Sequence, residues 1–290
     1  MNYKAEKNTF ILQDGRQLGF AEYGTTGGQA ILYFHGLPGS RLEAGHLHEI
    51  AVANNIRLIG LDRPGMGLSS IDHKRTILSW AADVEDFADS LGINKFSIVG
   101  HSGGAPFVAA CAYRLPHRLN GAAIVSGMAP FEIPEATASL TLGQRIINRI
   151  IKLIPWVANL FMKLIFIMLN KPNMLKQMLK QMPKVDQQIF KDPESSQAII
   201  NATKEAFRNG VAGVSQEINL TLKPWEFYLE DINFPITIWQ GGQDKQTPEM
   251  HAKIYAQLMP RAKLTFFKHE GHLSILRNHG EEILQSICKQ

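Results

Sequence analysis

The pattern of apolar and polar positions alternates short strand-like runs with longer helical stretches in the first half of the chain. Residues 8–13 and 17–24 flank an Asp-Gly turn at 14–15, which is typical of an antiparallel hairpin. A helical pattern over 76–92 has its apolar side chains on one face. Four more strand-like runs lie at 30–36, 56–65, 95–104 and 119–127. This alternation predicts a mostly parallel sheet flanked by helices.

The strand rhythm is interrupted between residues 130 and 234. Long apolar stretches there are broken by five prolines, so the pattern predicts several short helices. Strands return at 235–244 and 263–272, with one helix at 248–259 between them and a last helix from 273. The sequence therefore predicts an α/β core formed by residues 1–129 and 235–290, with an all-helical cap inserted at 130–234.

One strand-like run ends in the sequence Gly-His-Ser-Gly-Gly, which places Ser102 in a tight turn between a strand and a helix. Glycines around the serine allow such a turn, and the strained tip exposes the hydroxyl oxygen. The amides at the start of the following helix would favour negative charge beside it. The alternative is an ordinary glycine-rich turn without chemistry.

An activated serine needs a base, and the base needs an acid that holds its tautomer. Asp244 and His272 each follow a predicted strand, in the chain order serine, acid, histidine. We favour His272 over His269 because a glycine turn directly before it lets the ring swing toward the serine. Glu132 is the alternative acid.

These motifs resemble the α/β-hydrolase superfamily over essentially the whole chain. Further similarity lies in the segments HGLPG at 35–39 and DRPGMGLS at 62–69. The resemblance implies an eight-stranded, mostly parallel sheet with a helical cap that shapes the substrate pocket. It also implies a Ser102, Asp244 and His272 triad and an oxyanion hole made by the backbone amides of Leu37 and Gly103.

A serine nucleophile predicts acyl transfer, so we expect a carboxylesterase-like hydrolase of small to medium apolar substrates that works through an acyl-enzyme. Two other hypotheses are a proline-iminopeptidase-like aminopeptidase, whose HGGPG loop resembles residues 35–39, and a ligand-binding protein of this fold without turnover. Carbon-carbon bond hydrolases and cofactor-free haloperoxidases stay open. The histidines lack zinc-binding spacing, and no metal or other cofactor is expected.

Several other side chains are candidates for supporting roles. Asp62 is expected to organise its own loop, and Arg41 to form a surface salt bridge or to bind an anion. The candidate pocket residues are His35, which would order the oxyanion loop, His101, which would pack beside the nucleophile, and Trp225 and Trp156, which either line the pocket or pack inside the cap.

Charge is concentrated in the predicted cap. The chain carries a formal net charge of +4, but residues 140–184 hold eight Lys or Arg and no Asp or Glu, so the remainder is −4. No nucleic-acid-binding signature accompanies these cations. The apolar runs in this segment are interrupted by charges and a proline, so none approaches the roughly 20 residues of a membrane span.

The apolar face of this basic segment has two interpretations: it lines the pocket above Ser102, or it contacts a membrane surface. We favour the pocket, because each buried Leu, Ile or Phe contributes about 1.5–3 kcal/mol, and we expect little binding to anionic vesicles. Two cysteines are too few for a disulfide framework, and the N-terminus has no secretory signal pattern, which predicts a cytoplasmic protein.

Overall fold

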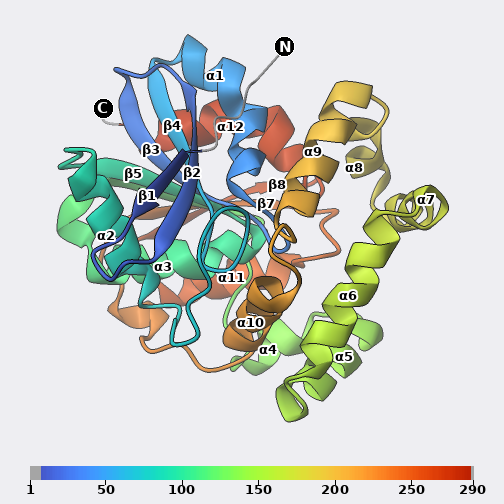
Figure 1. Ribbon diagram of the computed structural model, residues 1–290. Coiled ribbons are helices and arrows are strands. Elements are labelled where there is room, and N and C mark those ends of the chain that lie inside the picture. Colours follow the sequence, from blue (N-terminus) through green and yellow to red (C-terminus); the bar gives the residue numbers. More distant parts are fainter. Residues whose placement is uncertain (1–7, 289–290) are drawn as a thin grey trace.

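The computed structural model describes residues 8–288, and its centre is one sheet of eight strands in the order β1-β2-β4-β3-β5-β6-β7-β8 (Figure 1). β1 pairs with β2, and β2 with β4, in the antiparallel sense, while all other neighbours are parallel. The predicted mostly parallel sheet is therefore confirmed. The strands are β1 (Asn8–Ile11), β2 (Gln17–Gly24), β3 (Gln29–Phe34), β4 (Ile56–Leu61), β5 (Phe96–His101), β6 (Leu119–Val125), β7 (Ile236–Gly241) and β8 (Ala262–Phe267).

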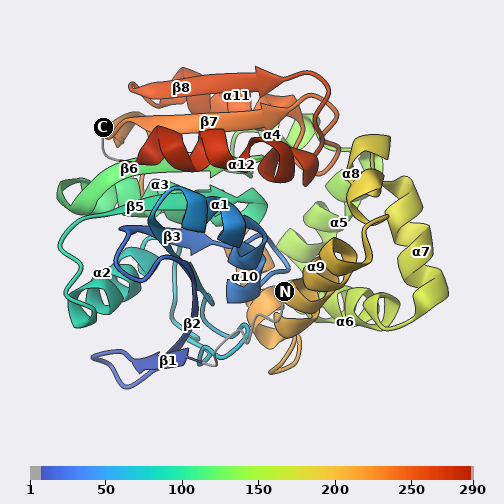
Figure 2. The same cartoon turned by 90° about the horizontal axis from the view of Figure 1, so that it is seen from above.

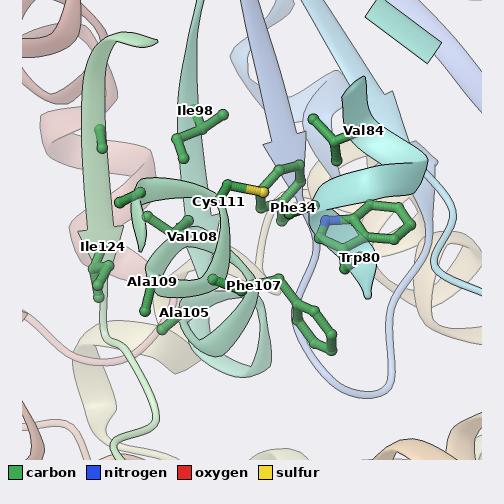
Figure 3. Packing of buried hydrophobic residues seen from close by; sticks show 14 of the residues in the cluster. Phe34, Trp80, Val84, Ile98, Ala105, Phe107, Val108, Ala109, Cys111 and Ile124 are labelled. Atoms are coloured by element: carbon green, nitrogen blue, oxygen red, sulfur yellow. The ribbon is translucent and has the colours of Figure 1, made fainter. Parts of the chain in front are cut away.

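Helices cover both faces of this sheet (Figures 1 and 2). One face packs against α1 (His48–Ala53) and α12 (Ser274–Ile287). The other packs against α2 (Trp80–Ser90), α3 (Ala105–Arg114) and α11 (Glu249–Leu258). On this second face the ring of Trp80 lies edge-on between Phe34 and Phe107, with centroids 5.6 and 6.1 Å away (Figure 3). A rigid core of this kind fixes the carboxyl ends of the parallel strands.

The inserted helices lie between β6 and β7 and form one body beside the carboxyl edge of the sheet (Figure 1). The last part of the predicted insertion packs against the α/β body, because Trp225, Phe227, Leu229 and Ile232 lie in its main core. The cap helices are α4 (Pro134–Ala138), α5 (Leu142–Leu153), α6 (Val157–Leu169), α7 (Pro172–Gln181), α8 (Lys184–Ile189), α9 (Pro193–Glu205) and α10 (Ala212–Thr221).

Two glycines form one of the contacts between the cap and the core, where α10 meets the loop after β4. A Cβ added to Gly65 would lie 2.7 Å from the Cα of Gly213, and a Cβ on Gly213 would collide with the Gly65 carbonyl. Gly65 also has a φ of +81°, a backbone conformation that other residues rarely adopt. Two backbones can approach this closely only without side chains, so a side chain at either position would push the cap away from this loop.

Candidate active site

Ser102 lies at the turn between β5 and α3, where a short 3₁₀ segment, η2 (Ser102–Gly104), joins them. Its φ is +54°, a strained left-handed conformation for a residue with a side chain. Neighbouring glycines permit the turn: a Cβ on Gly100 would lie 2.7 Å from the Gly104 carbonyl oxygen, and a Cβ on Gly104 would strike the Phe34 carbonyl. Ser102 is 8% exposed, so the residue has little contact with bulk water.

The loop after β3 brings its backbone amides beside this turn. A Cβ added to Gly103 would lie 3.2 Å from the Leu37 amide nitrogen, and one added to Gly36 would lie 3.5 Å from the Ser102 Cβ. Leu37 and Gly103, the two predicted oxyanion-hole residues, are therefore adjacent. Backbone N–H groups next to a helix start are suited to stabilising an oxyanion.

His272 and Asp244 meet at the carboxyl edge of the sheet. His272 Nδ1 lies 2.7 Å from Asp244 Oδ2, and both side chains are almost fully buried. The backbone amides of Gln246 and Thr247 donate to Asp244 Oδ1 at 2.8 and 3.0 Å. Burial raises the pKa of Asp244, but the attraction of His272 and these hydrogen bonds outweigh it, so the pKa falls to about 2. The carboxylate thus stays ionised and holds the proton of His272 on Nδ1.

The alternative base and acid lie elsewhere. The structure brings His272, and not His269, to Asp244, because the His269 side chain is exposed to solvent. Glu132 is also exposed. Among the described residues no hydrogen bond joins the Ser102 hydroxyl to His272; catalytic hydrogen bonds are often long without substrate and shorten when it binds.

A second buried histidine links the serine turn to the loop of His272. His101 Nδ1 lies 2.8 Å from Glu43 Oε1, and His101 Nε2 lies 3.0 Å from the backbone carbonyl of His272. Both partners are acceptors when Glu43 is ionised, so His101 donates from both nitrogens as an imidazolium. Burial lowers the pKa of His101, but the Glu43 carboxylate outweighs it, and the pKa is raised.

Glu43 is the centre of this link and belongs to a 3₁₀ segment, η1 (Arg41–Leu47). Besides His101 it accepts hydrogen bonds from the Tyr33 hydroxyl at 2.8 Å and from the Gly36 amide at 3.0 Å. Burial raises the pKa of Glu43, but His101 and the other partners lower it to about 2. One carboxylate therefore connects the oxyanion loop to the residue that precedes the serine.

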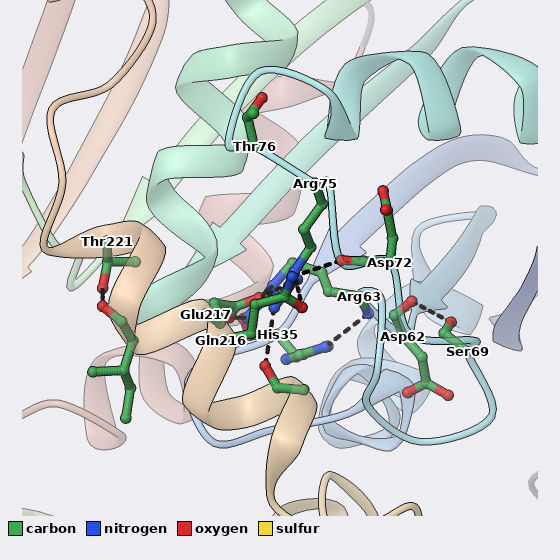
Figure 4. Close-up of polar contacts among 12 residues, drawn as sticks. His35, Asp62, Arg63, Ser69, Asp72, Arg75, Thr76, Gln216, Glu217 and Thr221 are labelled. Atoms are coloured by element: carbon green, nitrogen blue, oxygen red, sulfur yellow. Dashed lines mark hydrogen bonds and ion pairs between the residues drawn. The ribbon is translucent and has the colours of Figure 1, made fainter. Parts of the chain in front are cut away.

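An arginine holds the other side of the oxyanion loop (Figure 4). Arg63 donates to the carbonyls of His35 and Gly36 at 2.6 and 3.2 Å, and its guanidinium forms a two-pronged ion pair with Glu217 of α10. Arg75 also binds Glu217, at 3.0 Å, and all three charged side chains are buried. A cap carboxylate thus fixes the arginine that orders the loop.

His35 orders the same loop, as the sequence predicts. Its Nδ1 lies 2.7 Å from the Gly36 carbonyl, and its Nε2 accepts the Arg63 amide at 3.3 Å. Burial and the neighbouring Arg63 charge lower the pKa of His35 to about 3, so the ring is neutral with its proton on Nδ1. The residue is fully buried behind the loop and does not face a pocket.

A second cap carboxylate, Asp186 of α8, reaches the loop of the candidate base. Asp186 accepts hydrogen bonds from three consecutive amides, those of His272, Leu273 and Ser274, at 3.0, 3.0 and 2.9 Å. These amides lie at and just before the start of α12, whose N-cap residue Leu273 makes no side-chain cap. Asp186 is fully buried. It therefore takes the place of the missing N-terminal cap of α12, although it lies in a distant part of the chain.

Three of the other predictions need correction. Trp156 is 66% exposed at the turn between α5 and α6, so it neither lines an enclosed pocket nor packs inside the cap. Arg41 is not a surface residue: it is buried and pairs with Asp62 at 2.8 Å and Glu205 at 2.9 Å. Trp225 packs with Phe227 in the main core of the α/β body, which is neither the pocket nor the interior of the cap.

Asp62 organises its own loop, as expected. One of its oxygens accepts the Leu68 amide at 2.8 Å, and its backbone carbonyl accepts the Ser69 hydroxyl at 2.6 Å. Sequence reasoning missed Glu43, Asp186 and Glu217. Each is a single acidic residue outside any motif, and the only sequence signal is its place on an apolar side of a helical segment.

Comparison with known proteins identifies the family of this chain. The alpha/beta hydrolase fold family matches residues 29–278, and the chain belongs to that family. An uncharacterized hydrolase of Saccharomyces cerevisiae is 28% identical over 130 residues, which is 44% of this chain and 44% of the yeast protein. The chain spans less than half the length of the curated relatives that it matches.

Solved structures of similar fold include two esterases. An esterase from Exiguobacterium antarcticum has a TM-score of 0.71 at 17% identity and covers 97% of this chain and 98% of its own. A thermophilic esterase from Thermogutta terrifontis has a TM-score of 0.68 at 21% identity, with 98% and 97% covered. At these identities the likeness shows the fold, and the site itself must indicate the chemistry.

Proposed function

We propose that this protein is a serine hydrolase that cleaves a carboxylic ester, or a related acyl bond, of a small to medium apolar substrate. One observation carries the proposal: the strained Ser102 turn lies beside the Leu37 amide and at the same sheet edge as the buried His272 and Asp244 pair. The esterases among the structures of similar fold also support it.

In the proposed reaction, the Ser102 oxygen attacks the substrate carbonyl while His272 Nε2 takes its proton. Asp244 accepts the Nδ1 proton of His272 and so leaves Nε2 free as the base. The amides of Leu37 and Gly103 bind the oxyanion, the ester bond breaks, and His272 protonates the departing alcohol. Water activated by His272 then hydrolyses the acyl-enzyme and releases the acid.

The apolar character of the expected substrate follows from what covers the oxyanion loop. Leu37 packs against an apolar cluster formed largely by the cap, which includes Met162, Leu169, Phe207 and Val214. A substrate bound next to Leu37 would therefore meet methionine and aliphatic side chains, which favour an acyl chain over a charged group.

The direct test is covalent labelling with a fluorophosphonate, followed by mass spectrometry of the peptide. We expect one adduct on Ser102 and none in Ser102→Ala. Labelling at another residue, or none under conditions that label a control hydrolase, contradicts the proposal. If the protein is not labelled, the alternative hypothesis of a ligand-binding protein of this fold without turnover is favoured.

Paired variants test the acid and the base. His272→Ala should remove nearly all ester turnover, and His269→Ala, which alters an exposed ring three residues away, should retain most of it. Asp244→Asn should lower kcat by about 10⁴, the loss seen for the same change in serine proteases, with Glu132→Gln as the control. A mild effect at Asp244 with a severe one at Glu132 would exchange their roles.

Esters of increasing acyl length measure the substrate class. We expect kcat/KM to be highest for short to medium acyl chains and to fall when a charge is added to the acyl end. Faster cleavage of N-terminal proline amides than of any ester would instead assign the site to an aminopeptidase.

A further inference from the structure

The exposed apolar side chains of this protein are concentrated on two cap helices. Of the fifteen large hydrophobic residues that are exposed within residues 8–288, ten lie between positions 142 and 167, on α5, α6 and the turn that joins them. We call this surface the α5–α6 face. Its apolar members are Leu142, Ile146, Ile150, Leu153, Ile154, Trp156, Leu160, Leu164, Phe166 and Ile167.

The expectation that the apolar side of this segment lines the pocket is therefore wrong for these residues. α5 has two apolar sides. Ile147 and Ile151 face inward and pack against α6 and α10, whereas Leu142, Ile146, Ile150 and Leu153 recur at spacings of four, four and three on the side exposed to solvent. Exposed patches of this extent mark interaction sites rather than ordinary surface.

The most exposed part of the face is the turn between the two helices. Leu153, Trp156 and Leu160 are 73%, 66% and 59% exposed, although each would contribute favourable free energy if buried. Figure 1 shows this turn at the outer edge of the cap, on the side away from the sheet. The side chains of this turn can therefore be buried against another surface without a change in the core.

Positive charge borders the apolar side chains. On α5, Arg145, Arg149 and Lys152 follow the same helical spacing and form a stripe next to the apolar one. All eight cations of residues 140–184 are exposed, and none forms an ion pair within the part of the chain that the structure describes. The face thus combines an apolar surface with uncompensated positive charge.

We propose that the α5–α6 face binds the surface of an anionic lipid bilayer. Its aliphatic side chains and Trp156 would lie at the boundary between headgroups and acyl chains, and its cations would lie among the headgroups, as in interfacial amphipathic helices. No helix among the described residues is long and apolar enough to cross a bilayer, so the contact is peripheral.

Charge favours a membrane over a second copy of this chain. A two-fold interface places the same patch on both partners, so it would bring the unpaired cations of α5 against those of the other subunit. An anionic bilayer instead offers an apolar interior beneath a layer of negative headgroups, which matches both halves of the face. This binding does not depend on the proposed hydrolase activity.

Sedimentation with lipid vesicles measures the binding. We expect the protein to bind phosphatidylcholine vesicles that contain phosphatidylserine, to bind pure phosphatidylcholine weakly, and to dissociate as salt rises. Replacing Arg145, Arg149 and Lys152 by Gln should weaken partitioning by about 5-fold per cation, which corresponds to about 1 kcal/mol each. The matched control replaces Lys95, Lys263 and Lys268, three exposed cations outside the cap, and removes the same net charge.

Tryptophan fluorescence locates the contact. Trp80, Trp225 and Trp239 are at most 7% exposed, so only Trp156 reports on the surface. We expect the emission to shift to shorter wavelength when anionic vesicles are added. Trp156→Phe should lose this shift while it still sediments with the vesicles, because phenylalanine keeps an apolar side chain there.

Three results would overturn the proposal. They are no binding to phosphatidylserine vesicles at physiological salt, equal weakening in the α5 variant and its control, and a concentration-dependent dimer that disappears in Leu153→Ser. The last would make the face a self-association surface. Hydrolysis of a water-soluble ester by the α5 variant, measured in parallel, keeps this outcome separate from the fate of the proposed function.

Discussion

Asparagine at position 186 tests whether the cap holds the histidine loop in its working position. In the native protein, Asp186 Oδ1 accepts the amides of Leu273 and Ser274, and Oδ2 accepts the amide of His272. Asparagine has nearly the same shape but only one acceptor oxygen. With that oxygen on the first two amides, its NH₂ group faces the N–H of His272, and one hydrogen bond is replaced by two opposed donors.

The magnitude follows from the burial of this group. A hydrogen bond to a charged partner contributes about 1.5–3 kcal/mol, and a buried donor left without an acceptor costs a similar amount. Because Asp186 is fully buried, water does not replace the lost acceptor. We therefore expect Asp186→Asn to lower the free energy of unfolding by about 2 kcal/mol. The lost bond is the one to His272 itself, so kcat should fall on the order of 10- to 100-fold with KM little changed.

Urea denaturation and ester kinetics measure the two effects in the same sample. The control is Asp192→Asn, which alters an exposed carboxylate of the same cap that accepts the Ser195 amide at the start of α9. It should leave kcat unchanged. If Asp186→Asn loses stability but keeps full kcat, Asp186 is a structural cap alone, and the reasoning that links α8 to the base is refuted.

Three other predictions concern charge and packing. The pKa of Asp244 is lowered to about 2, so its contribution to stability should be complete above pH of about 4 and lost as the pH falls toward 2. The free energies of unfolding of wild type and Asp244→Asn, measured with urea, should therefore depend differently on pH in that window. The same pH dependence for both proteins would contradict this prediction. Glu217→Gln leaves two buried arginines underneutralised and should cost about 3–5 kcal/mol, with faster proteolysis within the cap; an unchanged midpoint would argue against it. Gly213→Ala should lower the melting temperature because its Cβ meets the Gly65 carbonyl, whereas Gly143→Ala, with open space around it, should not; equal melting temperatures would show that the cap is not seated on this contact.

The sheet and the serine turn could be predicted because their signals are local. Strand runs and glycine spacing report on neighbouring residues, and the structure places the strands within a few residues of the predicted ranges. The pairing of His272 with Asp244 was also expected, since both follow strands of one parallel sheet, whose carboxyl ends meet at one edge.

The carboxylates around the site could not be predicted because their partners are distant. Asp186 binds residues 86 to 88 positions away, and Glu217 binds Arg63 across 154 positions. A single acid on an amphipathic helix carries no sign of such a partner. The exposed face of α5 was misinterpreted for a related reason: periodicity shows that a helix has an apolar side, but not what covers that side.

The two buried cap carboxylates have a consequence for how the substrate specificity of the proposed hydrolase could be changed. Glu217 forms an ion pair with Arg63, which hydrogen-bonds to the oxyanion loop, and Asp186 hydrogen-bonds to the loop of His272. The cap is therefore not an interchangeable cover on an independent catalytic body. A chimera that receives a foreign cap for a new specificity would keep Ser102 and His272 in its sequence. It would also need an acid at the positions of Asp186 and Glu217 to keep the His272 loop and the oxyanion loop in place.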